Sequence, residues 1–345
     1  MKKKILAFII RGTLMLTFST VLGLSSHAIA GEKVIKWKVQ TAYPLTSTVT
    51  LHAYEWAKAI NRITNGRLQA EVYPSGSFCS PAEMITFLAK GTFDAAITYG
   101  GYYVGMLPEA NIESCMPMAH RSLFEVWDFM YMRGFQDIVQ ESYAKLGVRY
   151  WGTPCDCYYG IGTNFPIKSI DDIKGKRIRA TGLIAKLLEK LGASVTVIPG
   201  AELYMALKMG TIDGAVYGGG TLIPAKFYEV MKYWVQYPTL GHTNGAFFVS
   251  LKSLNKLPPD LKAIVDNSTR YILLDTTLQY FKRSEDMRLT LEGLGTKMVY
   301  LPEEDVDKMT AIAQDLWDEI ATANEACAKG VAILKEQLRY YGRLK

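Results

Sequence analysis

The sequence predicts an α/β protein with two lobes and largely parallel sheets. Helical and strand-like patterns alternate along most of the chain. A twenty-residue segment at 82–101 is repeated at 201–220, with nine identities and no gap. In addition, 315 of the 345 residues follow a candidate export signal, and that length is enough for two lobes with separate cores.

The first thirty residues have the pattern of a secretory signal peptide. Lysines at 2–4 precede an apolar stretch at 14–24, and the Ala-Ile-Ala sequence at 28–30 is a small-residue cleavage signal. An uncleaved membrane anchor is the alternative, but the apolar stretch is short for spanning a bilayer. We therefore expect cleavage after about Ala30 and export of the remaining chain.

The charge balance argues against a nucleic-acid partner. The chain has 39 basic and 33 acidic residues, and four of the basic residues lie in the signal, which leaves a net charge of +2. No basic run with interleaved aromatic residues follows the signal. The composition therefore points away from nucleic-acid binding.

The chain after the signal begins with a strand, a helix and a second strand. Residues 36–40 alternate in polarity as a strand does, and residues 67–73 do the same before Pro74 stops them. Between these strands, residues 49–64 place apolar side chains at helical spacing and end at an Asn-Gly pair. These three elements form the first α/β unit.

Each copy of the repeat predicts a helix, a glycine stop, a buried strand and a glycine-rich exit. Gly91 and Gly210 stand where a helix C-terminus favours a left-handed residue. The strands are expected at 93–98 and 212–217, and ligands of open α/β sheets bind at the carboxyl ends of such strands. A cleft between two lobes is the expected site for a small molecule. A common way of packing a helix on a strand would give the same repeat without a shared site.

The remaining elements continue the alternation. A strand at 176–180 leads into a helix at 184–191, and further strands follow at 194–198 and 246–251. Helical patterns complete the chain at 259–294, 303–324 and 326–340.

The motifs indicate a binding protein rather than an enzyme. The sequence contains no nucleophile elbow, zinc-protease helix, phosphate-binding loop or dinucleotide fingerprint. The three histidines after the signal and the five cysteines show no metal-ligand spacing. The odd cysteine count leaves at least one thiol unpaired or paired between chains. Asp171 and Asp172 fit the first turn of a helix better than a catalytic dyad.

Arg179 is the main candidate for ligand binding. It ends the strand at 176–180, directly before Thr181 and a helix start. A planar guanidinium at that position can face an anion, and the helix N-terminus adds free N–H groups. A solvated arginine at a strand end is the alternative. A second feature is a set of tyrosines near strand ends that could wall a pocket, namely Tyr99, Tyr102, Tyr103, Tyr158, Tyr159 and Tyr217.

Several segments together resemble the substrate-binding (DctP, or P) subunits of tripartite ATP-independent periplasmic (TRAP) transporters. The resemblance covers essentially the whole chain after the signal. It implies a periplasmic binding protein of two lobes, with crossover strands and a long helix at about 259–294 that spans both lobes. The lobes would be 31–152 plus about 245–283, and 153–244 plus about 284–345. The segments are NRITNGRLQAEVYPSG, GKRIRATGLIAKLLEKLGA, VIPGAELYMALKMGTIDGA, AKFYEVMKYW and LPPDLKAIV.

The resemblance also implies roles for individual residues. Arg179 corresponds to the family's signature arginine, which is expected to hold the carboxylate of an organic acid. Tyr99 and Tyr217 correspond to positions that contact ligand in relatives, and Asn244 falls at a cleft position. Tyr158 falls near a position that binders of 2-oxo acids use.

Three departures from the family pattern narrow the expected ligand. Phe165 stands where many relatives carry a second arginine, which argues against a dicarboxylate or a sialic-acid-type ligand. Val216 stands where binders of 2-oxo acids have a metal-binding Glu, and their metal-binding Gln is replaced at about Tyr158. We therefore expect neither a metal nor another cofactor. The upstream His-Pro turn of the family reads Thr46-Ser47 here.

The resulting hypothesis is a periplasmic solute-binding protein of a TRAP transporter. It would capture a small organic acid anion, which is a monocarboxylate such as a 2-oxo or 2-hydroxy acid, or a small sulfonate. It would then deliver this anion to the small and large integral membrane permease subunits. A secreted hydrolase or lyase acting on such an acid, and a binding protein that feeds a sensor, are the alternatives. A monomer is expected, with a dimer left open.

Overall fold

The structure is a computed structural model that describes residues 33–45, 47–152 and 155–344. The chain divides into two compact units, Met1–Ile35 and Lys36–Lys345, and the architecture below is that of the second. The expected signal peptide at 1–30 lies outside the described residues. Within those ranges, no helix combines the length and the apolar character that a membrane span requires.

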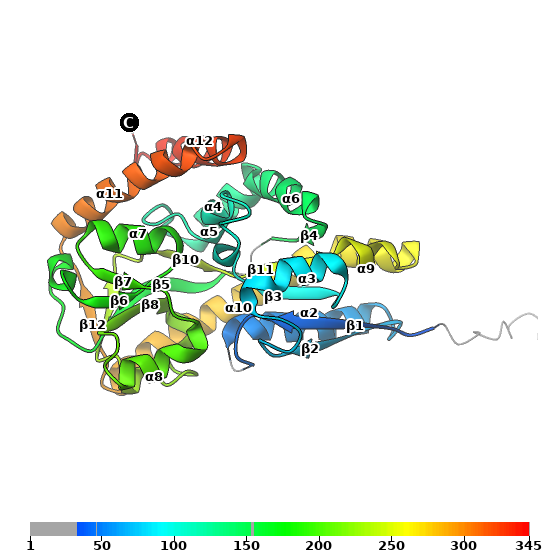
Figure 1. Cartoon of the computed structure of the whole chain (residues 1–345), viewed down its shortest axis with the longest axis horizontal. Coiled ribbons are helices and arrows are strands. Elements are labelled where there is room, and N and C mark those ends of the chain that lie inside the picture. Colours follow the sequence, from blue (N-terminus) through cyan, green and yellow to red (C-terminus); the bar gives the residue numbers. More distant parts are fainter. Residues whose placement is uncertain (1–32, 46, 153–154, 345) are drawn as a thin grey trace, which may run out of the picture. The chain divides into compact units, whose positions relative to one another are not determined.

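Two mixed sheets organise the described part of the second unit (Figure 1). The first sheet has the order β2-β1-β3-β11-β4, and the second has the order β12-β9-β5-β8-β6-β7, with β10 paired to β5. The strands of the first sheet are β1 (Ile35–Thr41), β2 (Leu68–Tyr73), β3 (Ala95–Thr98), β4 (Val148–Tyr150) and β11 (Ala246–Ser250). Those of the second are β5 (Cys155–Thr163), β6 (Arg177–Arg179), β7 (Ser194–Thr196), β8 (Gly214–Gly218), β9 (Tyr233–Tyr237), β10 (Gly241–Asn244) and β12 (Lys297–Tyr300).

The strand directions follow from the way the chain passes between the sheets. Strands of the α/β units pair in parallel, as predicted: β1 with β3, β6 with β7 and β8, and β9 with β12. In contrast, β5 runs antiparallel to β8, β9 and β10, and β11 runs antiparallel to β3 and β4. The chain enters the second sheet at β5, directly after β4, and returns to the first at β11, directly after β10. These are the crossover strands that the family resemblance implies.

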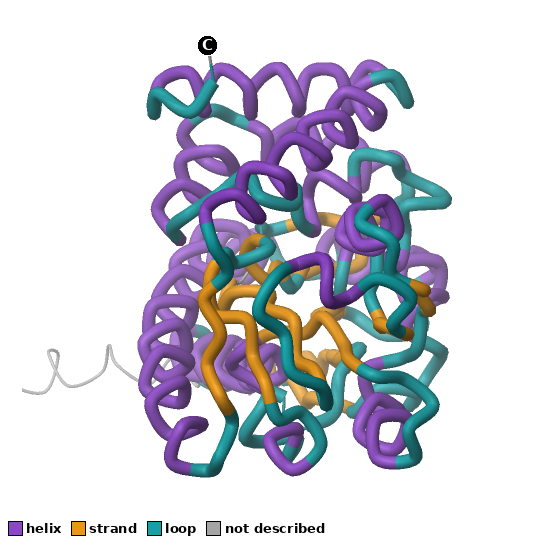
Figure 2. The backbone as a smooth tube through the Cα atoms, turned by 90° about the vertical axis from the view of Figure 1, so that its left-hand side faces the viewer, coloured by secondary structure: helices purple, strands orange, loops and turns teal. Residues whose placement is uncertain are grey.

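Helices flank the strands on both sides (Figure 2). The helices expected from the sequence are confirmed, with ends shifted by up to about three residues. Three helices, α4 to α6, and a π-helical turn at Asp128–Met132 were not predicted from the sequence. The helices are α2 (Thr48–Ile63), α3 (Met84–Lys90), α4 (Ala110–Ser114), α5 (Leu123–Trp127), α6 (Phe135–Lys145), α7 (Gly182–Lys190), α8 (Leu203–Lys208), α9 (Leu251–Asn255), α10 (Pro259–Gly293), α11 (Glu303–Ala321) and α12 (Glu325–Tyr340).

Both copies of the repeat fold as the sequence predicts. Helix α3 ends at Gly91 with φ 78°, and β3 and a 3-10 turn follow. Helix α8 is followed by Gly210 with φ 69°, and then by β8 and a 3-10 turn. The left-handed backbone conformation at a helix end costs little free energy for glycine, because glycine has no Cβ. The 3-10 turns occupy Gly100–Tyr102 and Gly219–Thr221, at the carboxyl ends of the two strands.

Helix α10 contacts α2, which packs on β2 and β3 of the first sheet, and also contacts β5 and β12 of the second sheet; Figure 1 shows it passing behind them. On the side of the first sheet, His52 and Trp56 of α2 hydrogen-bond to the hydroxyl groups of Thr276 and Thr269, at 2.7 and 3.1 Å. Farther along α10, Leu291 joins a hydrophobic cluster of the second sheet with Trp234. The expectation of one long helix in contact with both halves of the protein is therefore confirmed.

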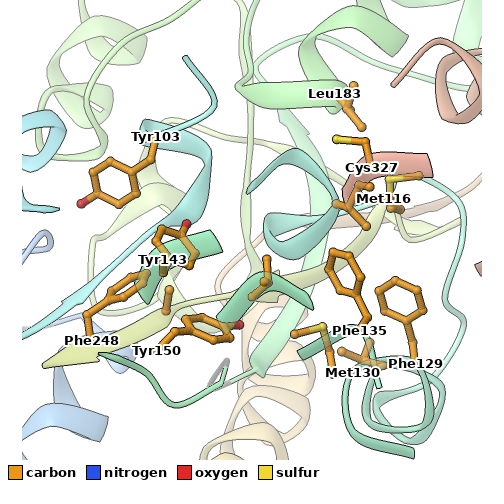
Figure 3. Packing of buried hydrophobic residues seen from close by; sticks show 14 of the residues in the cluster. Tyr103, Met116, Phe129, Met130, Phe135, Tyr143, Tyr150, Leu183, Phe248 and Cys327 are labelled. Carbon is orange, nitrogen blue, oxygen red and sulfur yellow. The ribbon is translucent and has the colours of Figure 1, made fainter. Parts of the chain in front are cut away.

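The largest core cluster joins the first sheet to helices from distant parts of the chain. Figure 3 shows Tyr143 and Tyr150 around Phe248 of β11, with ring centroids 4.6 and 5.4 Å from that of Phe248. Phe129 and Phe135 stack at 4.8 Å in the same cluster. The C-terminal helix α12 contacts α6 and α4 and contributes several buried side chains, including Cys327. Its buried face therefore belongs to the core of the first sheet.

The paired acids of the sequence cap a short helical turn. Ser169 and Asp172 form a capping box at Ile170–Ile173, because each side chain bonds to the backbone N–H of the other end of the turn. Asp171 forms ion pairs with Lys174 and Lys308 on the surface. These bonds support the capping interpretation of the two aspartates.

Candidate ligand-binding site

A cavity of about 490 Å³ opens where the two copies of the repeat end. The first copy contributes Tyr99, and Tyr102 follows it directly, while the second copy contributes Tyr217 and Gly218. Residues 42–44, which follow β1, add to the same wall. The remaining described lining residues are Ser47, Val49, Pro74, Ser75, Pro81, Cys157, Tyr159, Arg179, Thr181, Pro199, Gly200, Ala201, Glu202, Thr221 and Gly245.

Arg179 lies in the wall of this cavity, as predicted for the end of its strand. Its side chain is 6% exposed. Nε donates a hydrogen bond to the carbonyl of Ile198 at 2.9 Å, and Nη1 donates to the carbonyl of Val216 at 3.1 Å. Both acceptors are neutral, and among the described residues no carboxylate forms an ion pair with this guanidinium. A buried charge without a counter-ion is costly, so the site favours an anionic ligand.

The surroundings of Arg179 orient its guanidinium plane. Its Cζ lies 5.7 Å from the ring centroid of Tyr217, within the range of a cation–π contact. Thr181, also in the wall, is the N-cap of α7, and its side chain makes no capping hydrogen bond. The positive end of the α7 dipole thus borders the same cavity.

Tyr99 and Tyr217 line the cavity from opposite sheets, as the sequence predicts. Tyr99 is 7% exposed, and its ring meets that of Tyr102 edge to face at 5.5 Å. Burial raises the pKa of Tyr99, and burial also raises the pKa of Tyr102 while the charge of Arg179 lowers it. Both phenols are therefore neutral near pH 7 and can donate hydrogen bonds to an anion.

Tyr158 and Asn244 are placed differently from these residues. The ring of Tyr158 packs against His242 and Phe281, at 4.5 and 5.2 Å, and does not belong to the described lining of the cavity. Its neighbour Tyr159 lines the cavity instead, since successive side chains of a strand point to opposite faces. The backbone of Asn244 ends β10 opposite Cys155 of β5.

Part of the wall was not predicted from the sequence. Tyr43 and Pro44 were not among the predicted site residues, although a turn at the carboxyl end of a parallel strand is a place where ligands bind. Glu202 lies inside the second copy of the repeat and is the only acidic residue in the described lining. Its position in the second copy of the repeat was the sequence feature that could have identified it as a lining residue.

The described side chains provide neither a second cation nor a cluster of metal ligands at this site. Phe165, at the position of the family's second arginine, lies under the ammonium group of Lys176 and outside the described lining. Within residues 33–45, 47–152 and 155–344, no three His, Cys, Asp or Glu side chains are placed to hold a metal ion. The chemistry of the cavity is that of one buried cation surrounded by tyrosines.

Glu113 is a fully buried acid behind the cavity wall. It lies on α4, against Gly100 of the first repeat exit, and accepts a hydrogen bond from the Tyr150 hydroxyl at 3.2 Å. Burial raises the pKa of Glu113 from 4.5 to about 8, and the hydrogen bond with Tyr150 opposes the shift. The carboxyl group is therefore protonated in the folded protein at neutral pH.

Glu113→Gln is expected to flatten the pH dependence of stability between pH 6.5 and 8. In this window the unfolded chain has released the Glu113 proton and the folded protein retains it, so the free energy of unfolding falls as pH rises, by at most about 2 kcal/mol. Buried His120 and His242, with pKa values of about 4 and 3, act with the opposite sign, mainly below pH 6.5. The part of their effect that extends above pH 6.5 is the same in the wild type and in Glu113→Gln. Urea unfolding at pH 6.5 and 8 measures the effect.

The control for this experiment is Glu336→Gln, whose side chain is 76% exposed. In this variant the free energy of unfolding should change between pH 6.5 and 8 by the same amount as in the wild type. Equal slopes for all three proteins would show that Glu113 does not titrate in this window.

The comparisons with known proteins agree with this architecture. Residues 39–324 match the model of the DctP family, described as bacterial extracellular solute-binding protein, family 7. The monocarboxylate 2-oxoacid-binding periplasmic protein of Nostoc sp. is 27% identical over 310 residues, which cover 88% of this chain and 84% of that protein.

Solved structures show the same fold. A TRAP periplasmic solute-binding protein of Chromohalobacter salexigens with bound (S)-(+)-2-amino-1-propanol has a TM-score of 0.80 at 24% identity, covering 90% of this chain and 97% of that one. Another, from Colwellia psychrerythraea with bound calcium and pyruvate, has a TM-score of 0.82 at 22% identity, covering 90% and 96%. The chain therefore belongs to the DctP family of bacterial extracellular solute-binding proteins, whose members are binding proteins and not enzymes.

Proposed function

We propose that this protein is a periplasmic receptor that binds a small organic acid monoanion and delivers it to the membrane subunits of a TRAP transporter. The observation that carries the proposal is Arg179, a buried guanidinium without a carboxylate partner among the described residues, in the wall of a cavity. A carboxylate or sulfonate would accept hydrogen bonds from the guanidinium and neutralise its charge. Tyr99, Tyr159 and Tyr217 would shape the site.

The two sheets would form two lobes that close on the ligand. The lobes predicted from the sequence are 31–152 plus about 245–283 and 153–244 plus about 284–345. We move α12 (Glu325–Tyr340) from the second of these to the first, because it packs on α4 and α6. Strands β5 and β11, together with α10, would form the hinge, since the chain changes sheets there. Asn244 belongs to this hinge, and a role for it in binding stays a prediction.

A thermal-shift screen tests the proposal. The protein is recovered from the periplasm, where its mass should correspond to a chain that starts at Gly31, and is screened against 2-oxo, 2-hydroxy and aryl carboxylates and sulfonates. A ligand at a hundredfold excess over Kd adds about 2.7 kcal/mol of stability, so at least one acid should raise the melting temperature. The uncharged amide of that acid should not. A screen in which no acid shifts the transition would refute the proposal.

A further inference from the structure

The residues that line the cavity indicate which chemical group the ligand carries in addition to its acid group. For the acid group itself, this inference rests on the proposed function. A three-carbon 2-oxo acid has six non-hydrogen atoms, and even if each took up as much space as a water molecule in the liquid, roughly 30 Å³, the acid would occupy at most about 180 Å³. The cavity measures about 490 Å³. A small acid held by Arg179 would leave more than half of this volume to water.

Five tyrosine rings belong to the described wall of this cavity. Tyr43, Tyr99 and Tyr102 approach from the first sheet, and Tyr159 and Tyr217 approach from the second. Tyr99 and Tyr102 already meet edge to face, a geometry that a further ring can extend. Four prolines, at 44, 74, 81 and 199, add rigid apolar surface. Such walls suit a flat apolar group better than a chain of hydroxyl groups.

The polar side chains of the wall are likewise unsuited to a chain of hydroxyl groups. The described lining contains no Asn, Gln, Asp, His or Lys, which are the side chains that would fix the several hydroxyl groups of a sugar acid. Arg179 is the only cation in that lining, and Glu202 adds a negative charge. A second carboxylate on the ligand would therefore find repulsion and no partner.

From these observations we infer that the natural ligand is an aryl monoanion, an aromatic ring that carries one carboxylate or sulfonate. The acid group bonds to Arg179, and the ring lies between the tyrosines of the two sheets. Arg179 itself contacts the face of Tyr217, so the acid group and the ring are held by adjoining parts of one wall.

Isothermal titration calorimetry with the purified protein tests the inference. The probes are benzoate, benzenesulfonate, 3-phenylpropanoate, pyruvate, phthalate and benzyl alcohol. At least one of the three aryl monoanions should bind tenfold or more tightly than pyruvate and phthalate, and benzyl alcohol should not bind. The ratio of benzoate to benzenesulfonate affinity then distinguishes the two acid groups.

Substitutions of single tyrosines test whether the aromatic rings of the wall cause the preference for aryl acids. Tyr102→Ala and Tyr217→Leu should each weaken binding of the preferred aryl acid by about five- to tenfold, as expected for the loss of one aromatic pair. Tyr340→Ala, with a ring that is 77% exposed on α12, should leave the affinity unchanged. Melting temperatures of the ligand-free variants show whether each one folds.

The failure of this inference differs from the failure of the proposed function. Tight binding of pyruvate without binding of any aryl acid would overturn the inference and leave the organic acid receptor intact. Tighter binding of phthalate than of benzoate would also overturn it, since the ligand would then be a dianion. If no acid of any kind binds, both the inference and the proposed function are wrong.

Discussion

Replacing Arg179 by methionine is expected to weaken binding of the organic acid by at least about thirtyfold. Removal of one partner from a buried, hydrogen-bonded charge pair costs about 2–5 kcal/mol, and each 1.4 kcal/mol corresponds to a factor of ten in Kd. Methionine retains the unbranched stem of arginine and removes the charge and the donors. Calorimetric titration with the acid found in the thermal-shift screen measures the loss.

Two further variants separate charge, geometry and folding. Arg179→Lys keeps the charge but not the planar fork, and its affinity should lie between those of the wild type and Arg179→Met. Arg177→Met removes an arginine from the first position of the same strand, where it pairs with Asp213 at the surface, and should leave Kd unchanged. Unchanged affinity in an Arg179→Met protein with a normal melting temperature would show that the anion binds elsewhere.

The sequence was sufficient for the parts of the fold that have a strong local pattern. The repeat predicted α3 and β3 in its first copy and α8 and β8 in its second, because each copy combines a helical period, a glycine stop and a short apolar run. The position of Arg179 at the end of a strand was also predictable from the sequence, since a strand end before a helix start is a recognisable position for an anion-binding residue.

The parts that could not be predicted depend on contacts between distant segments. Strand β5 was not predicted, and without it there was no basis for deciding which of Tyr158 and Tyr159 faces the cavity, because a shift of one residue reverses the faces of a strand. Helices α4 and α5 have only five residues each and are stabilised by tertiary packing, so their periodicity is too short to detect. The buried carboxyl group of Glu113 follows from that packing.

The second large effect concerns Gly100 and Gly219, which occupy the same position in the two copies of the repeat. Gly100→Ala is expected to lower the free energy of unfolding by about 2–6 kcal/mol. A Cβ at this position would overlap Oε2 of Glu113 and lie 2.9 Å from its Cδ. Overpacking of a core costs about 1–3 kcal/mol, and displacing the carboxyl group also breaks its hydrogen bond with Tyr150, for about 1–3 kcal/mol more.

Gly219→Ala provides the matched control. Its Cβ would meet Trp234 and the carbonyl of Tyr158 at 3.7 Å, which is ordinary van der Waals contact. Neither Gly100 nor Gly219 has a positive φ, so backbone strain does not separate the two substitutions. The variant should unfold in urea within about 1 kcal/mol of the wild type. Equal losses for both would mean that the turn itself, and not Glu113, requires the glycine.

A double substitution identifies the cause of the difference. Glu113→Ala removes the carboxyl group that the Cβ at position 100 would overlap, so adding it to Gly100→Ala should cost less than it does in the wild type. Adding Glu113→Ala to Gly219→Ala should cost the same as in the wild type, because position 219 does not contact Glu113. A positive coupling in the first pair alone would show that the buried carboxyl group of Glu113, behind the ligand cavity, is the reason why position 100 requires a glycine. No contact of this kind and no positive φ requires a glycine at position 219.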